Sequence, residues 1–258
     1  MKIAAFQFKG SSNVEENLGA IQRGIVKASE QNVRILLTQE CALCGYPPLE
    51  TEKASQVDFN KLEQATEKIL QLAVQHRMYI VLGTIMSNAG SYTNSIILIS
   101  PDGAKNPVYH KRALWGWDRG NFTPGHEKGV ITIDDVRLGF RICYEVRFPE
   151  YFRELFREKV EIACVSFCDV EKEPNLARYE LIKSHLITRA VENAIYILSV
   201  NSCSGYQTAP TCLIDPDGEV IEIAPPEEEY LLTFEYVRSG SNFGRDGRIL
   251  HSKELLRI

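Results

Sequence analysis

The sequence predicts a protein of mixed α and β structure, of the α/β or α+β class, with strands and helices alternating along the chain. Short apolar runs of strand length are separated by longer segments whose apolar residues recur every three or four positions. The 258 residues are 44% hydrophobic and 24% charged, which is typical of a globular protein with a large core. Because no Pro/Gly/Ser-rich linker interrupts the pattern, we expect one domain over residues 1–258, with a C-terminal tail from about residue 239.

The first part of the chain begins with an apolar strand and a helix. Leu18, Ile21 and Ile25 share one face of that helix. Asn13 can cap its N-terminus. A Pro-Asp-Gly turn at 101–103 joins two later strands. The expected elements are strand 2–8, helix 13–30, strand 33–38, helix 59–76 and strands 78–83, 93–100 and 107–111.

The second part follows a loop rich in glycine and tryptophan. Pro149 suits the first turn of a helix, and a second Pro-Asp-Gly turn separates two strands near the end. Residues 239–258 are polar and glycine-containing, with a short amphipathic end at 253–258 that can pack against a partner subunit. The expected elements are strands 129–134 and 138–143, helix 149–158, strand 161–167, helix 177–193, strand 194–201, a strand–turn–strand at 211–223 and strand 230–237.

Charge and cysteine content exclude several classes of function. The net charge of −5 argues against nucleic acid or an anionic membrane as the main partner, since both favour a basic surface. The apolar runs are far shorter than the ~20 residues of a membrane helix, and the N-terminus lacks a signal-peptide pattern. Seven cysteines form an odd set without scaffold-like spacing, so we expect reduced thiols in the cytoplasm.

Three residues with reactive side chains lie at the ends of expected strands. Glu40 follows strand 33–38, Lys111 closes strand 107–111, and Cys143 precedes a helix whose N-terminus favours a thiolate. Taken singly, they are a loop carboxylate, a solvated lysine and a small buried thiol. Together, the carboxylate can take the thiol proton, the ammonium can hold an oxyanion and the thiolate can attack.

The segments around these residues resemble the three motif regions of the nitrilase superfamily, the carbon–nitrogen hydrolases. They read LLTQECALCGYPP, YHKRALW followed by FTPG, and GFRICYEVRFPE. TRAVENAIYILSVN and LIDPDGEV are similar to two further family segments, and the resemblance covers residues 1–236. It implies a four-layer α-β-β-α sandwich.

The resemblance also implies the role of each motif residue. Glu40 is the expected general base, Lys111 the electrostatic stabiliser and Cys143 the nucleophile, with a backbone N–H near Tyr144 at the oxyanion. Many members carry a second active-site glutamate where this chain has Asp118, which is one methylene shorter. Whether Asp118 replaces that glutamate stays open. The implied reaction is amide hydrolysis through a cysteine thioester, without a metal or other cofactor.

The substrate is left open by the sequence. The favoured reading is an amidase, for example of an ω-amide, and the alternatives are an N-carbamoyl amine hydrolase, a nitrilase or an inactive binding relative that kept the fold. The expected pocket residues are Tyr46, Trp117, Arg119, Arg147 and Cys168. Either Arg119 or Arg147 can clamp a substrate carboxylate, but Arg147 can equally pair with Glu150 or Glu192. By analogy with the family we expect a homodimer or higher homo-oligomer that acts on a small molecule.

Other catalytic arrangements have weaker support. Cys41 and Cys44 form a C-x-x-C pair, but Gly-Tyr-Pro-Pro follows instead of the helix that a redox pair requires. Cys164 and Cys168 do not have the spacing of a zinc knuckle. Neither a G-x-S-x-G serine motif nor a phosphate-binding G-x-x-x-x-G-K motif occurs in the sequence.

Overall fold

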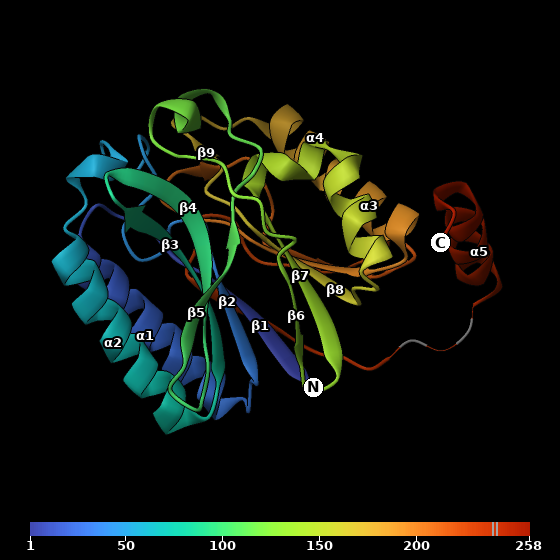
Figure 1. The fold of residues 1–258 in the computed structure, drawn as a ribbon, viewed down its shortest axis with the longest axis horizontal. Helices are drawn as coiled ribbons and strands as arrows, with labels where there is room; N and C mark the ends of the chain where they lie inside the picture. The colour runs from blue at the N-terminus through green and yellow to red at the C-terminus, as the bar shows by residue number, and fades with distance from the viewer. Residues whose placement is uncertain (239, 241) are drawn as a thin grey trace.

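The computed structural model describes residues 1–238, 240 and 242–258. Two six-stranded sheets lie face to face, and pairs of helices cover their outer faces, so that the layers run α-β-β-α (Figure 1). The expected four-layer sandwich is therefore confirmed.

The first sheet has the strand order β14-β1-β2-β3-β4-β5. Strands β1, β2 and β3 are parallel, while β14, β4 and β5 each run antiparallel to a neighbour. Asn13 caps α1 by accepting a hydrogen bond from the backbone N–H of Glu15, as its position predicts. The elements are β1 Lys2–Gln7, α1 Val14–Glu30, β2 Ile35–Thr38, α2 Phe59–His76, β3 Tyr79–Asn88, β4 Ser91–Ile99, β5 Lys105–His110 and β14 Tyr230–Glu235.

The second sheet has the strand order β13-β12-β10-β8-β7-β6, with β7, β8 and β10 parallel. A separate two-stranded sheet, β9 with β11, was not expected, because two-residue strands leave no periodic signal. The elements are β6 Val130–Ile133, β7 Val136–Ile142, α3 Pro149–Arg157, β8 Ile162–Ser166, β9 Val170–Glu171, α4 Leu176–Asn193, β10 Tyr196–Val200, β11 Tyr206–Gln207, β12 Cys212–Ile214 and β13 Val220–Ile223.

Both faces of each sheet are buried, and this explains the continuous apolar runs. On β1, Ile3 and Ala5 belong to the core between the sheets, while Ala4 and Phe6 pack in the core beneath α1 and α2. A third core lies between the second sheet and helices α3 and α4. A strand covered on both faces has no reason to alternate polar and apolar residues.

The carboxyl ends of the parallel strands of the two sheets meet at one edge. Ser166 Oγ at the end of β8 donates a 2.9 Å hydrogen bond to the carbonyl oxygen of Thr38 at the end of β2. The backbone N–H of Glu40 donates to the carbonyl oxygen of Phe167 at 3.2 Å. This junction fixes the loops after β2 and β8 against each other.

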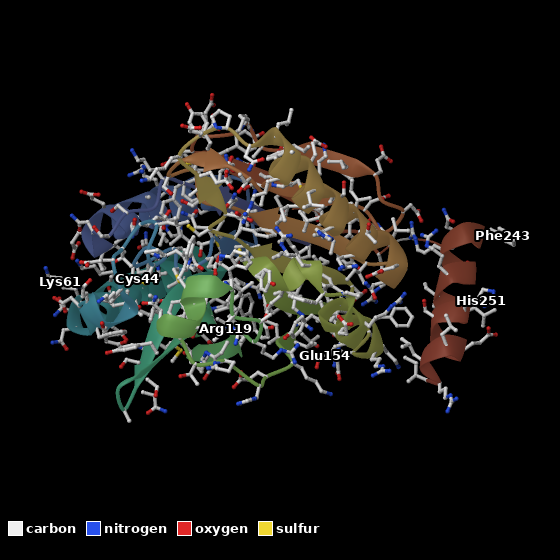
Figure 2. The ribbon with its side chains drawn as sticks, turned by 90° about the horizontal axis from the view of Figure 1, so that it is seen from above. Cys44, Lys61, Arg119, Glu154, Phe243 and His251 are labelled. Atoms are coloured by element: carbon white, nitrogen blue, oxygen red, sulfur yellow. The ribbon has the colours of Figure 1, made fainter. Side chains whose placement is uncertain are left out.

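The C-terminal segment differs from the expected tail. Its expected first residue, Ser239, lies outside the described residues, and within the tail Phe243–Leu256 form helix α5, for which no bounds were predicted. The Asn242 side chain caps this helix by accepting from the N–H groups of Gly244 and Arg245, so two glycines in the first turns are tolerated. Helix α5 lies beyond α3 at the side of the molecule (Figure 1). Phe243 marks its outer end (Figure 2).

Candidate active site

Glu40, Lys111 and Cys143 meet at the edge where the strands end. Glu40 follows β2, Lys111 follows β5, and Cys143 follows β7 as the first residue of a 3₁₀ turn, η3, at Cys143–Arg147. Strands β3 to β5 are successively antiparallel, so β5 ends at the same edge as β2. Glu40 and Lys111 are each 1% exposed, whereas Cys143 is partly open to a pocket.

Both carboxylate oxygens of Glu40 accept hydrogen bonds. Lys111 Nζ lies 2.7 Å from Oε1, and Asn94 Nδ2 donates to the same oxygen at 2.6 Å. The backbone N–H of Cys168 donates to Oε2 at 2.9 Å. Burial raises the pKa of Glu40, the Lys111 charge opposes that rise, and the Asp118 charge adds to it.

Lys111 is enclosed by two carboxylates. Asp118 Oδ2 lies 2.8 Å from its Nζ, on the other side from Glu40, and the Asp118 side chain is fully buried. Tyr46 donates a 2.6 Å hydrogen bond to Asp118 Oδ1, and Trp117 Nε1 donates to the Tyr46 hydroxyl at 3.2 Å. Burial alone would lower the pKa of Lys111, but the Glu40 charge and its neighbours raise it well above the ordinary value. The shorter acid at 118 therefore still reaches the lysine.

The surroundings of the Cys143 thiol disfavour its ionisation. Burial raises its pKa well above the ordinary value, Glu40 raises it further, and Lys111 only partly offsets the rise. These surroundings oppose the thiolate that the following helix N-terminus was expected to favour. The causes are burial, which comes first, and the local charges, since Glu40, Asp169 and Asp118 all oppose a thiolate and Lys111 alone favours it.

The turn that carries Cys143 is held by the buried carboxylate of Glu145. Cys143 has a φ of +47°, a left-handed conformation that costs a non-glycine residue on the order of 1 kcal/mol. Glu145 Oε2 accepts from the N–H of Ile142 at 2.7 Å, and Oε1 accepts from the Tyr109 hydroxyl at 2.7 Å and from the N–H of Arg112 at 2.8 Å. Glu145 thus joins the cysteine turn to the loop that begins at Lys111.

A pocket of about 110 Å³ opens onto Cys143. Four of the five expected substrate residues line it, namely Tyr46, Trp117, Arg147 and Cys168. Arg119 does not line this pocket and instead borders a separate hollow that includes Phe122 and Tyr151. Its label in Figure 2 lies on the turn η2, Gly116–Gly120. The remaining lining residues are Leu49, Trp115, Tyr144, Val146, Asp169, Val170, Glu171, Arg178 and Ile182.

The pocket contains two arginines with different surroundings. Arg178 is 2.8 Å from Asp169, so its charge is balanced within the pocket wall. Arg147 forms no ion pair with Glu150 or Glu192 in the part of the chain that the structure describes, and Glu192 is bound by Arg189 at 2.9 Å. Its nearest aromatic contact is the Tyr144 ring, with the guanidinium carbon 6.0 Å from the centroid. Arg147 is therefore available to a substrate anion.

Sequence reasoning missed several residues that complete the site. Asn94 and Glu145 make the hydrogen bonds described above, and Asp169 and Arg178 form one wall of the pocket. Asp169 directly follows Cys168 after β8, and this position was the one sequence signal that could have identified it as a pocket residue. Asn94 lies within an apolar strand and Arg178 within a helix, where neither spacing nor composition distinguishes them.

The other cysteines do not form a second reactive centre. All seven cysteines are free, and Cys41 and Cys44 are buried at 0% and 1% exposure. Burial raises the pKa of the Cys41 thiol, which opposes a redox role for the C-x-x-C pair.

Among the described residues no helix is long and apolar enough to cross a membrane.

Comparison with known proteins identifies a matching family and several similar enzymes. A family model described as carbon-nitrogen hydrolase matches residues 2–240. The chain is 28% identical over 244 residues to a deaminated glutathione amidase from Synechocystis sp. strain PCC 6803, covering 84% of this chain and 85% of that protein. It is 26% identical over 236 residues to a 2-oxoglutaramate amidase from Bacillus subtilis, covering 88% and 87%.

Solved structures share the fold. An amidase from Nesterenkonia sp. AN1 superposes with a TM-score of 0.82 at 23% identity, covering 100% of this chain and 98% of that chain. A cysteine-to-alanine variant of that amidase in complex with butyramide gives a TM-score of 0.83 at 22% identity, covering 100% and 95%. At this identity the likeness shows a common architecture.

Proposed function

The chain belongs to the carbon-nitrogen hydrolase family, and we propose that it hydrolyses small carboxylate-bearing amides to the carboxylic acid and ammonia through a thioester on Cys143. The observation that supports this most strongly is the buried Lys111 ammonium, 2.7 Å from Glu40 and 2.8 Å from Asp118. Tyr46, which donates a hydrogen bond to Asp118, lines the same pocket as the Cys143 thiol. An acid, an ammonium and a thiol in this arrangement suit acyl transfer.

In the first half of the reaction, Glu40 takes the Sγ proton of Cys143 as sulfur attacks the amide carbonyl carbon. The Lys111 ammonium has three N–H donors, of which Glu40 and Asp118 occupy two, so one remains for the developing oxyanion. The backbone N–H of Tyr144 is the second donor. The tetrahedral intermediate collapses when Glu40 returns the proton to nitrogen, ammonia leaves, and a thioester remains.

In the second half, water replaces ammonia. Glu40 takes a proton from the water as its oxygen attacks the thioester carbonyl, and the same donors hold the oxyanion. The C–S bond breaks, the sulfur recovers a proton from Glu40, and the carboxylic acid is released. Because the surroundings of Cys143 oppose a thiolate, the first half-reaction depends on the base, and the second depends on it for the activation of water.

The pocket favours a small substrate with one negative charge. A volume of about 110 Å³ is well below the several hundred cubic ångströms of drug-sized sites. Arg147 supplies a positive charge without an acidic partner among the described residues, while Arg178 is neutralised by Asp169. Two relatives are named for carboxylate-bearing amides, of which 2-oxoglutaramate has one negative charge and deaminated glutathione is larger and has two. We therefore assign Arg147 to the substrate carboxylate.

Ammonia release across a substrate panel tests the proposal. The panel contains ω-amides such as succinamate, neutral aliphatic amides, N-carbamoyl amines and nitriles. We expect the highest kcat/KM for ω-amides and none for Cys143→Ala, whose fold stays intact. Cys212→Ala is the matched control, because that thiol is fully buried in the second sheet. Acyl-enzyme of the expected mass should accumulate on Cys143 when the reaction is quenched with acid.

Two results would reject the assignment. Hydrolysis by the Cys143→Ala variant would exclude a thioester on this residue. If carbamoyl amines or nitriles are turned over in preference to every amide, the enzyme is an N-carbamoyl amine hydrolase or a nitrilase instead of an amidase. A wild-type protein that releases ammonia from no substrate and whose Cys143 resists alkylation would be a binding relative.

Localisation and assembly complete the proposal. Seven free thiols suit a reducing compartment, so we assign the chain to the cytoplasm. Phe243 and Leu255 on α5 are 97% and 82% exposed, which supports a homodimer that covers them. Light scattering after size exclusion, compared with a Phe243→Ser variant, measures the mass. A wild-type mass of one chain would refute the dimer.

A further inference from the structure

We propose that Asn94 is a positioning residue for the reaction, which holds Glu40 Oε1 so that Oε2 is the oxygen that exchanges protons with Cys143 and with water. The inference rests on the proposed function, since it concerns how the Glu40 base is aligned. It follows from the separate hydrogen bonds of the two carboxylate oxygens.

The Oε1 atom of Glu40 is already occupied. Lys111 Nζ donates to it at 2.7 Å and Asn94 Nδ2 at 2.6 Å, so two strong donors use its two lone pairs. The Asn94 amide must present its NH₂ group here, because its carbonyl oxygen would repel the carboxylate at that distance. Oε1 is therefore a fixed anchor and not a proton acceptor.

The Oε2 atom of Glu40 has fewer hydrogen-bond donors than Oε1. Among the described residues its one hydrogen-bond donor is the backbone N–H of Cys168, at 2.9 Å. Cys168 lines the same pocket as Cys143. Oε2 therefore keeps a lone pair, and the charge of Glu40 acts on the Cys143 thiol, so we assign to Oε2 the proton transfer with the thiol and with water.

Asn94 also fixes the lysine through its backbone. The N–H of Lys111 donates to the carbonyl oxygen of Asn94 at 2.8 Å. One residue of β4 therefore holds the base with its side chain and the start of the lysine loop with its main chain. If the amide were removed, the carboxylate of Glu40 would lose the contact that opposes its rotation toward Lys111.

Stability alone does not explain an asparagine at this position. Asn94 is 1% exposed, and its Oδ1 has no hydrogen-bond partner among the described residues. A buried amide oxygen without a partner is unfavourable, so an apolar side chain would suit a buried strand better. The value of this residue lies in the contact of its NH₂ group with Glu40.

The test measures pH profiles of Asn94→Ala and of Asn94→Asp, which keeps the shape of the side chain. One readout is kcat/KM for succinamate, and the other is the rate of Cys143 alkylation by iodoacetamide, which does not require turnover. The chain offers a matched control in Asn193→Ala. Asn193 is also buried, with an unpartnered Oδ1, but its Nδ2 donates to the Arg189 carbonyl on α4.

We expect Asn94→Ala to lower kcat about tenfold or more, as for loss of one hydrogen bond to a charged group, with little change in KM. The acid limb of both profiles should move to higher pH, because the Asn94 hydrogen bond lowers the pKa of Glu40. Asn94→Asp places a second carboxylate against Oε1 and should move the limb further. Asn193→Ala should reduce thermal stability without moving the limb.

Several outcomes would overturn the inference. If both Asn94 variants keep the wild-type acid limb, or if Asn193→Ala moves it equally, Asn94 has a structural role. If Asn94→Ala does not fold, the same criterion applies to Asn94→Asp. If Cys143 in the Glu40→Gln variant is alkylated at the wild-type rate, the proposed function itself is rejected. The two failures are therefore distinguishable.

Discussion

Replacement of Glu145 by glutamine should destabilise the protein and disable the site together. Glu145 is fully buried, and its carboxylate accepts four hydrogen bonds, from the Tyr109 hydroxyl and from the N–H groups of Arg112, Ala113 and Ile142. Glutamine has the same shape but only one acceptor oxygen. Its NH₂ group must therefore face at least one of these donors.

The magnitude follows from that count. If the amide oxygen takes the Oε1 position, the N–H of Ile142 loses its acceptor, and the three remaining bonds become bonds to a neutral group. One lost charged hydrogen bond, a buried unpaired donor and three weakened bonds together cost about 3–5 kcal/mol. For a chain of 258 residues, about 2–4 °C per kcal/mol predicts a fall in Tm of roughly 6–20 °C.

Differential scanning fluorimetry and steady-state kinetics measure the two effects. Glu145 joins the turn of Cys143 to the loop after Lys111, so kcat/KM should fall at temperatures where the variant is still folded. Glu150→Gln is the control, because that exposed residue in the first turn of α3 should change stability by less than about 1 kcal/mol. A Glu145→Gln enzyme with wild-type Tm and kcat/KM would show that this carboxylate does not hold the site.

Three further predictions concern the reacting groups. Lys111→Ala should lower kcat about 10²–10³-fold, as for loss of one oxyanion donor. Lys105→Ala changes a half-buried lysine of β5 that pairs with α2 and should leave kcat unchanged, so equal kcat values for the two variants would refute the role of Lys111. Arg147→Ala should raise KM for succinamate but leave KM for a neutral amide such as butyramide unchanged. An equal rise in both KM values would refute a contact between Arg147 and the substrate carboxylate. Burial raises the pKa of Glu40, so kcat/KM should fall as pH decreases through a value above the ordinary glutamate pKa of about 4.3. An acid limb at or below about 4.3 would contradict a raised pKa for Glu40.

The sequence predicted the elements because each leaves a local signal. The cap at Asn13, the helical spacing in α1 and the apolar runs of the strands all have the same physical basis in the structure. The positions of Glu40, Lys111 and Cys143 at strand ends were predicted on the same ground, and the structure brings Glu40 and Lys111 into contact. That Cys143 acts on a substrate remains a prediction.

Other features depend on tertiary geometry that no local signal encodes. Arg119 was grouped with Trp117, but side chains two residues apart in a 3₁₀ turn point in directions about 120° apart, so they border different hollows. Asn94 resembles any polar residue within a strand until β4 lies beside β3 and the loop after β2. The opposition to a thiolate was missed for a related reason, because the following helix is visible in the sequence and the nearby charges are not.

The charge balance of the site decides which mechanism the fold supports. A thiolate at rest requires a net positive surrounding, such as a histidine cation. Here Glu40, Asp118 and Lys111 carry a net charge of −1, and Asp169, which also opposes a thiolate, is balanced by Arg178. Adding a thiolate would bring the site to −2 in a medium that screens charge poorly. The thiol proton must therefore move onto Glu40 as sulfur attacks, which keeps the net charge constant through the step. The same balance explains why the lysine stays charged despite burial, since two carboxylates compensate its desolvation. A second acid beside Lys111 thus suits a base-assisted thiol and would oppose a preformed thiolate.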